Sequence, residues 1–307
     1  MVVNGPATYN MSASRRRYDL LYKRLDQFTR TLHALGEGDV RALHRTRVAS
    51  RRLREILPVL QLKPELASRL GRRLKKVTAG LGDVRELDVL VQLVDELRTS
   101  GRHDQQVLRR VLTSINDDRR DARDRLQTKL PTKEIERVAH KLESVAKDLR
   151  DLKPSRGWQW AVDARVSRRA ETLTQALDEA GSLYLPERLH QVRIALKKLR
   201  YAIEVAAESA GTKPSADVRA LKRHQDILGR LHDLHVLIDR IRQIQPSLAP
   251  PDVTMWRKID ALIPSLEDEC RRLHAKFVSQ QGAIRALCDR VTRATEAAPP
   301  SRRAVAS

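Results

Sequence analysis

The chain has 307 residues, with 60 Lys and Arg against 39 Asp and Glu, and a formal net charge of +21 at pH 7. Such an excess of positive charge indicates an anionic partner. Aromatic residues make up only 3% and charged residues 32%, which excludes an aromatic-rich β-sandwich and favours charged amphipathic helices.

Apolar residues that recur every three to four positions predict about ten helices, which end at Gly and Pro. Asp39 is a predicted helix N-cap. A run of alternating charges over residues 117–125 predicts a solvent-exposed helix face. The predicted helices cover residues 14–35, 39–62, 64–80, 83–98, 104–129, 131–149, 158–180, 186–209, 214–229, 233–243 and 253–292.

The helix pattern predicts two halves of similar size. The expected organisation is a flexible N-terminal tail over residues 1–13, a first helical half over 14–150, a linker over 151–157, a second helical half over 158–290 and a disordered C-terminal tail over 291–307.

The two cysteines, Cys270 and Cys288, fall in one predicted helix. A separation of 18 residues places them about 27 Å apart, too far for a disulfide, so we expect buried thiols and a reducing compartment. The N-terminus has no apolar targeting segment, and no run of 18 apolar residues occurs in the sequence. The sequence therefore predicts a soluble, cytoplasmic protein without a membrane partner.

The most informative feature is an internal repeat. Residues 44–54 align without gaps with residues 190–200 at an offset of 146, and both segments read His-x-x-Arg-aliphatic-Ala-x-basic-basic-Leu-Arg. Residues 74–90 align with residues 221–237 at an offset of 147. The repeat predicts a duplicated helical bundle with approximate two-fold symmetry.

Each copy of the first block forms two faces when successive residues advance by about 100° around a helix. One face is apolar and predicted to pack into a core. The predicted core residues are Ala49, Leu53, Ile56, Leu57 and Leu60 in the first copy and Ala195, Leu199, Ala202, Ile203 and Ala206 in the second. The adjoining face is basic. The first basic ridge consists of His44, Arg47, Arg51 and Arg54, and the second basic ridge consists of His190, Arg193, Lys197 and Arg200.

Both ridges place like charges four residues apart, which destabilises an isolated helix. No acidic residue occurs over residues 43–54 or 189–203 to relieve this repulsion. A bound polyanion would relieve it, and a merely solvated basic face is the alternative.

The two ridge histidines, His44 and His190, have three open roles: contact with phosphate, helix packing or proton transfer. The surrounding arginines favour a neutral ring. The remaining histidines form no metal-binding motif, and no glycine-rich nucleotide loop is present, so we expect neither a metal nor a cofactor. Glu86 and Asp233 occupy equivalent repeat positions and are interpreted as helix caps or as partners of a nearby Arg.

The repeated blocks resemble the CHAD domain, the conserved histidine α-helical domain. Residues 44–54 match its His-x-x-Arg-Val-x-x-Arg-Arg-Leu-Arg helix, and residues 81–89 match its Leu-Gly-x-x-Arg-Asp-Leu-Asp-Val helix with Glu86 in place of Asp. In the second copy His232 replaces the Arg and His235 replaces the last Asp. The resemblance covers about residues 14–290.

This resemblance implies an all-α fold in which two pseudo-symmetric four-helix bundles form one domain. It also implies a central basic pore or groove that binds inorganic polyphosphate, and an association with polyphosphate granules. The implied contacts are His44, Arg47, Arg51, Arg54, Lys75, Arg85, His190, Arg193, Lys197, Arg200 and Lys222. Many members are fused to a CYTH triphosphatase domain, but its Glu-x-Glu-x-Lys strand is missing here, so the chain resembles the stand-alone form and is expected not to be an enzyme.

Two other functions remain open. The charge of +21 suits nucleic acid, which we expect to bind only non-specifically because no DNA-binding motif is recognisable and aromatic residues are few. A phosphohydrolase that uses the two ridge histidines is the other alternative.

Overall fold

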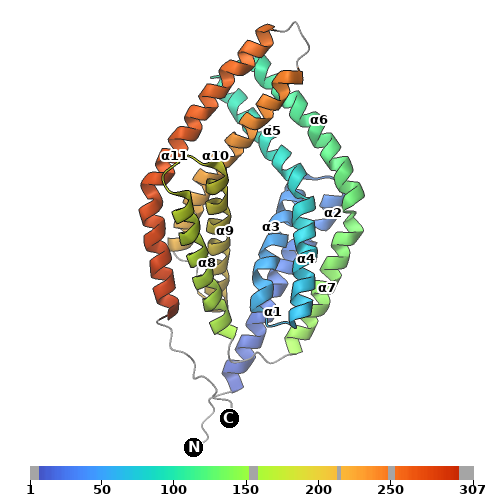
Figure 1. Cartoon of the computed structure of the whole chain (residues 1–307). Coiled ribbons are helices and arrows are strands. Elements are labelled where there is room, and N and C mark those ends of the chain that lie inside the picture. Colours follow the sequence, from blue (N-terminus) through green and yellow to red (C-terminus); the bar gives the residue numbers. More distant parts are fainter. Residues whose placement is uncertain (1–6, 152–157, 213–215, 248–252, 297–307) are drawn as a thin grey trace, which may run out of the picture.

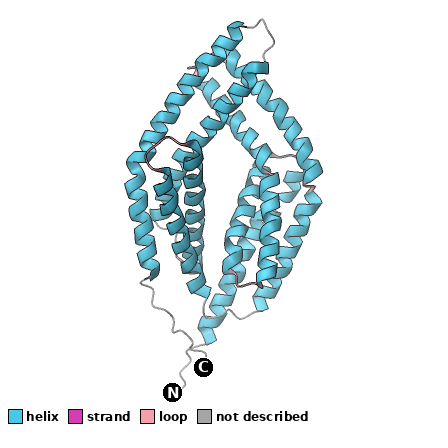
Figure 2. Cartoon of the chain, in the orientation of Figure 1, coloured by secondary structure: helices cyan, strands magenta, loops and turns pink. Residues whose placement is uncertain are grey.

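The computed structural model of the chain describes residues 7–151, 158–212, 216–247 and 253–296, and every regular element in these ranges is a helix (Figure 2). The predicted all-α fold is confirmed. The first part of the chain forms α1 (Ala7–Thr29), α2 (Leu32–Gly36), α3 (Val40–Ile56), the 3-10 helix η1 (Leu57–Val59), α4 (Pro64–Gly80), α5 (Gly82–Ser100), α6 (Gln105–Lys129) and α7 (Thr132–Asp151). The second part forms α8 (Trp158–Ala180), α9 (Pro186–Ser209), α10 (Ala216–Ile244), the 3-10 helix η2 (Gln245–Ser247) and α11 (Val253–Glu296).

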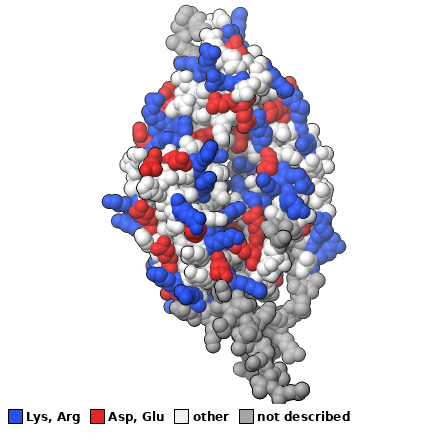
Figure 3. Space-filling model, turned by 180° about the vertical axis from the view of Figure 1, so that it is seen from behind, with Lys and Arg blue, Asp and Glu red and all other residues white. Residues whose placement is uncertain are grey.

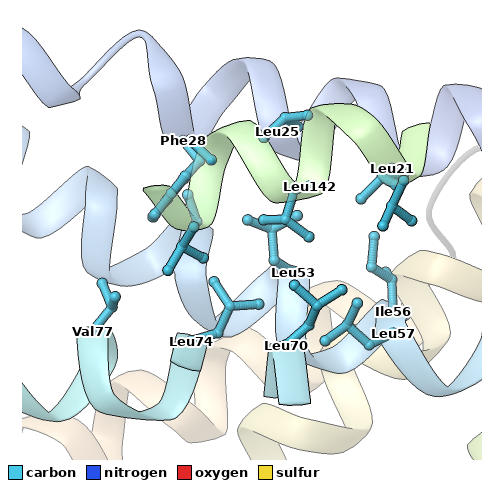
Figure 4. Close-up of a cluster of buried hydrophobic side chains, with 14 of the residues drawn as sticks. Leu21, Leu25, Phe28, Leu53, Ile56, Leu57, Leu70, Leu74, Val77 and Leu142 are labelled. Atoms are coloured by element: carbon cyan, nitrogen blue, oxygen red, sulfur yellow. The ribbon is translucent and has the colours of Figure 1, made fainter. Parts of the chain in front are cut away.

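The first hydrophobic core lies among α1, α3, α4 and α7. Figure 4 shows side chains from all four helices meeting there, among them Phe28, Leu53, Leu74 and Leu142, and all four are buried. Burial of a side chain of this size stabilises the fold by about 1.5–3 kcal/mol. The core therefore fixes α3 by its apolar face.

A second core lies among α8, α9, α10 and α11. Leu173, Leu199, Leu228 and Phe277 represent the four helices in it. The contacts of the two groups correspond: α1 touches α3 and α7 as α8 touches α9 and α11, and α3 touches α4 as α9 touches α10. The two copies of the sequence repeat thus occupy matching places in two helix groups that stand side by side in Figure 1.

A third core joins the two parts of the chain. Helices α5 and α6 pack against α10 and α11 in the upper part of Figure 1, with Leu93, Ile115, Leu237 and Leu266 buried between them. Because α10 and α11 contribute to the second core as well as the third, the third core attaches α5 and α6 to the second group of helices.

Several helix boundaries differ from those predicted. The helix predicted over residues 14–35 is two helices, because the hydroxyls of Thr29 and Thr31 donate to the carbonyl oxygens of Leu25 and Phe28 and compete with the helical hydrogen bonds. The helix predicted over residues 39–62 ends at Ile56, since Pro58 follows.

Other boundaries shift without a break. The side chain of Asp39 caps α3 as predicted, by accepting from the backbone of Ala42. The break predicted between residues 229 and 233 is absent, because Leu228, Leu231 and Leu234 are all buried and their packing outweighs the low helix propensity of one glycine.

The ends of the chain extend the helices further than predicted. Helix α1 begins at Ala7 and α11 continues to Glu296, so parts of the predicted tails over residues 1–13 and 291–307 are helical. Residues 1–6 and 297–307, and most of the predicted linker, lie outside the described residues. Both cysteines are buried in α11, as predicted.

Candidate anion-binding cleft

The two basic ridges border one cleft. Helices α3 and α9 contact each other, and their polar faces, together with parts of α5 and α10, enclose a cavity of about 540 Å³, which we call the central cleft. Among the described residues that line it are seven Arg or Lys side chains, three histidines and only two acidic side chains. Basic side chains also gather along the midline of the face shown in Figure 3, although acidic ones are interspersed there. The volume is typical of a ligand site.

The apolar face of each ridge helix explains why the basic face points into the cleft. The predicted core residues Ala49 and Leu53 are buried in the first core, and their counterparts Ala195 and Leu199 are buried in the second. With those faces fixed on opposite sides, the two basic faces turn toward each other.

Arg47 and Arg193 are held in the same way in the two copies. The guanidinium of Arg47 lies 3.6 Å from the position that a Cβ would take at Gly82, and its Nε donates to the carbonyl oxygen of Thr78 at 3.3 Å. The Nε of Arg193 lies 3.9 Å from the corresponding position at Gly229. The glycine repeated in both copies thus leaves room for an arginine to lie against the next helix.

Several cationic groups in the cleft lack a hydrogen-bond acceptor. The Nε atoms of Arg51, Arg52 and Arg193 are buried without a hydrogen-bond partner among the described residues. Such donors are costly to bury unless an acceptor satisfies them. An anion in the cleft would supply the acceptor oxygens.

The concentration of positive charge alters the protonation of the cleft. Burial, followed by the charges of Arg193, Arg51 and Arg47, lowers the pKa of Lys197 to about 6. Burial and the neighbouring Arg51 lower the pKa of Arg47 to about 10. The cleft therefore holds more positive than negative charge, and this excess favours the deprotonated form of Lys197.

The ridge histidines have different neighbours. Desolvation and the charge of Arg85 lower the pKa of His44 to about 4. At the equivalent place in the second copy His190 lies against His232, with their Nδ1 atoms 3.3 Å apart and their ring centroids 4.5 Å apart. Burial and then Arg193 lower the pKa of His232 to about 3, and burial and Arg193 also lower the pKa of His190. The neutral rings expected from the sequence agree with these shifts.

Two arginines of the cleft, Arg200 and Arg52, already have partners. Arg200 stacks on the ring of Tyr201 at 4.6 Å, and Arg52 lies 5.6 Å from the same ring. Arg200 donates to Glu204 and to Gln225, and Arg52 lies 3.7 Å from a Glu204 oxygen. The charges of Arg200 and Arg52 are thus partly balanced by Glu204.

The two acidic residues of the cleft face the arginines. A carboxylate oxygen of Asp233 lies 3.9 Å from Arg193. The pKa of Asp233 and the pKa of Glu86 are both raised, chiefly by burial. Arg193 opposes the rise at Asp233, and Arg47 opposes it at Glu86. Because Asp233 lies within α10 and not at its start, its interpretation as a helix cap is wrong and its role as an arginine partner holds.

Eight of the eleven predicted site residues line the central cleft: His44, Arg47, Arg51, Arg85, His190, Arg193, Lys197 and Arg200. Arg54 lies near Arg51 and Lys198 but does not line the cleft. Lys75 and Lys222 are exposed and also lie outside it, and the first copy of the second block lines the cleft only from Gly82 onward.

The sequence interpretation missed Arg52, Tyr201 and Gln225, which also line the cleft. Arg52 follows Arg51 in the adjacent basic pair of the first motif, and this pair was the one feature of the sequence that could have indicated it. The sequence interpretation also missed the carboxylate of Asp88, whose charge acts on Arg85. The buried carboxylate of Asp88 accepts from Arg119 at 2.6 Å and lies 3.9 Å from Arg123, so part of the charged run over residues 117–125 faces inward.

The architecture and the cleft define an all-helical protein with a duplicated basic motif. The sequence profile of the CHAD domain matches residues 19–242, and the chain belongs to this family. It shares its fold with the CHAD domain from the plant Ricinus communis, with 22% identity, a TM-score of 0.56 and coverage of 93% of this chain and 92% of that one. PptA from Streptomyces chartreusis is similar, with 18% identity, a TM-score of 0.54 and coverage of 91% and 99%. None of the curated proteins compared matches this chain.

Two kinds of feature are absent from the described residues. No helix among them has the length and apolar content needed to cross a membrane. No group of three or more His, Cys, Asp or Glu side chains among them is arranged to hold a metal ion.

Proposed function

We propose that the central cleft binds inorganic polyphosphate and that the protein acts by binding and not by catalysis. The observation that carries the proposal is the meeting of both basic ridges in one cleft, where seven cationic side chains face two acidic ones. The resemblance to the CHAD domain points to the same ligand. The proposal includes a cytoplasmic location on polyphosphate granules, which co-localisation in cells would test.

The expected mechanism is electrostatic. Arginine forks can each engage two non-bridging phosphate oxygens, and the unpartnered Nε atoms of Arg51 and Arg193 are donors already in place. A polyphosphate chain carries no bases, so recognition depends on charge density and on the number of phosphates in contact. Each neutralised phosphate releases counterions, which makes the affinity fall steeply with salt.

A length series tests the proposal. Calorimetric titration with orthophosphate, tripolyphosphate and long-chain polyphosphate should give rising affinity, because a longer chain contacts both ridges at once. Equal affinity for orthophosphate and long chains would contradict it.

Non-specific binding of nucleic acid is the second candidate, supported by the net charge of +21. Competition separates the two. If the cleft is a polyphosphate site, polyphosphate should displace a DNA duplex at equal phosphate concentration, whereas DNA retained in excess polyphosphate would reverse the order.

The absence of catalysis is also open to test. Incubation of the protein with polyphosphate, with and without divalent cations, should release no phosphate above a blank. Release that His44→Ala abolishes would establish a hydrolase.

A further inference from the structure

Lys197 differs from the other cationic groups of the central cleft. It lines the cleft from α9, directly between Arg193 and Arg200 in helical sequence, and among the described residues it makes no hydrogen bond or ion pair. An ammonium group has three donors and no acceptor, so its burial is unfavourable here unless a ligand in the cleft supplies an acceptor.

Lys197 is surrounded by cations on two helices. Arg47 and Arg51 approach from α3, and Arg193 and Arg200 lie on its own helix. On α10 the titratable groups that interact with it are Asp233 and His232. Arg85 and Glu86 line the same cleft from α5.

This environment favours a neutral amine. Burial and the four arginines lower the pKa of Lys197 to about 6, so most molecules carry an uncharged amine at pH 7. An exposed lysine with the ordinary pKa has only about one neutral amine in 2,500 at that pH. A neutral amine is a nucleophile, and this one stands among groups suited to hold a phosphate.

We propose that Lys197 is a covalent modification site, acylated by acyl phosphates whose phosphate group is held by the arginines of the central cleft. The inference rests on the anion binding proposed above and adds a second class of ligand. Acyl phosphates join a phosphate, which Arg51 and Arg193 can bind, to an electrophilic carbonyl, which the amine can attack.

The reaction balances without another reagent. The nitrogen lone pair of Lys197 attacks the acyl carbonyl carbon, the N–C bond forms, and the bond between the carbonyl carbon and the bridging oxygen breaks. The phosphate leaves with that electron pair and takes up one proton from the nitrogen. An amide and hydrogen phosphate result. The arginines stabilise the negative charge that develops on the departing phosphate.

Acylation should close the cleft to polyphosphate. The amide of modified Lys197 cannot be protonated, and the acyl group occupies cleft volume. Modified protein should therefore bind polyphosphate more weakly than unmodified protein.

The experiment is incubation of the full chain with acetyl phosphate at pH 7, followed by mass spectrometry with fragmentation that resolves each lysine. Lys75 and Lys222 are matched controls, since both are exposed and outside the cleft. We expect Lys197 to be acetylated at least about tenfold faster, because its gain in neutral amine outweighs the lower nucleophilicity of a less basic group. Its rate should level off at a lower pH than the control rates, because one bound phosphate group raises the pKa of Lys197 only part of the way from about 6 to its ordinary value.

A neutral acyl donor separates amine reactivity from phosphate binding. With p-nitrophenyl acetate the preference for Lys197 should shrink, and saturating polyphosphate should protect Lys197 from acetyl phosphate. Acetylation of Lys197 no faster than that of Lys222 would overturn the inference, as would an undiminished preference with the neutral donor. Polyphosphate titration of the same preparation shows independently whether the proposed function holds, so the two failures are distinguishable.

Discussion

The two basic ridges come from copies of one motif, yet they present different groups to the central cleft. The first ridge offers Arg51 beside Arg47 and has Arg85 next to its histidine. The second ridge offers Lys197 beside Arg193 and has His232 next to its histidine. The first side therefore carries permanent cations, whereas the second carries groups whose charge depends on pH and on the ligand.

The difference extends to the supports behind the ridges. Asp88 is 3% exposed and neutralises Arg119, and its charge also reaches Arg85. The equivalent residue in the second copy is His235, which is paired with Asp239 near the surface. The second copy thus lacks both the Arg that corresponds to Arg85 and the buried Asp that corresponds to Asp88.

The largest expected effect comes from reversing charge on both ridges at once. The double variant Arg47→Glu with Lys197→Glu should lower polyphosphate affinity by about 100-fold or more, because two charge-assisted contacts are lost and repulsion replaces them. Titration with long-chain polyphosphate at fixed salt measures the loss, and circular dichroism checks the fold.

The matched control makes the same change in formal charge away from the cleft. Arg110→Glu with Arg272→Glu alters two exposed side chains outside the cleft and should cost only a few-fold in affinity. Comparable losses from the two double variants would mean that overall charge governs binding and that the ridges have no special part.

The burial of Asp88 predicts that this position contributes more to the free energy of unfolding than its counterpart in the second copy. Asp88→Asn removes the buried negative charge that pairs with Arg119 and should lower the free energy of unfolding by about 2–3 kcal/mol. His235→Asn, at the equivalent position, should change it by less than about 0.5 kcal/mol. Urea unfolding of both variants gives the comparison, and equal changes would show that the Asp88 network contributes no more than its surface counterpart.

The lowered pKa of Lys197 predicts that the protein takes up a proton when an anion binds in the cleft. An anion raises the pKa of Lys197 from about 6 toward its ordinary value, so the bound state holds up to about one more proton at pH 7.5. The contribution of Lys197 to the affinity should be constant below pH 6 and should fall as the pH rises above it. Titration calorimetry in two buffers of different ionisation enthalpy measures the uptake.

Lys197→Arg is the control for proton uptake, since an arginine stays charged in the empty cleft. It should remove most of the uptake at pH 7.5 and flatten the affinity between pH 6 and 9. An unchanged uptake in this variant would assign the proton to another group.

The sequence predicted the helical class, the repeat and the inward basic face, because helical periodicity separates apolar from basic residues within each motif. It could not place Arg54 outside the cleft, since that depends on how α3 packs against α9 in the folded chain. It also missed the inward role of Arg119. Local charge alternation indicated a solvent face, and only the packing of α6 against α5 brings that side chain to Asp88.

The smallest expected effect comes from restoring the first-copy residue in the second copy. His232→Arg places a permanent cation where His232 is neutral in the empty cleft, with its pKa lowered to about 3. We expect polyphosphate to bind about three- to fivefold more tightly at pH 7, which corresponds to less than 1 kcal/mol and to one additional partly screened contact. The new guanidinium lacks the buried carboxylate that stands behind Arg85. His232→Arg combined with His235→Asp places a carboxylate at the equivalent, partly exposed position and should recover part of any stability that the single variant loses. In both variants the rise in affinity between pH 6 and 5 that a protonating His232 contributes should be smaller than in the unmodified chain. If the double variant binds no more tightly and keeps the full pH dependence, His232 does not contact the ligand, and the histidine pair only packs α9 against α10.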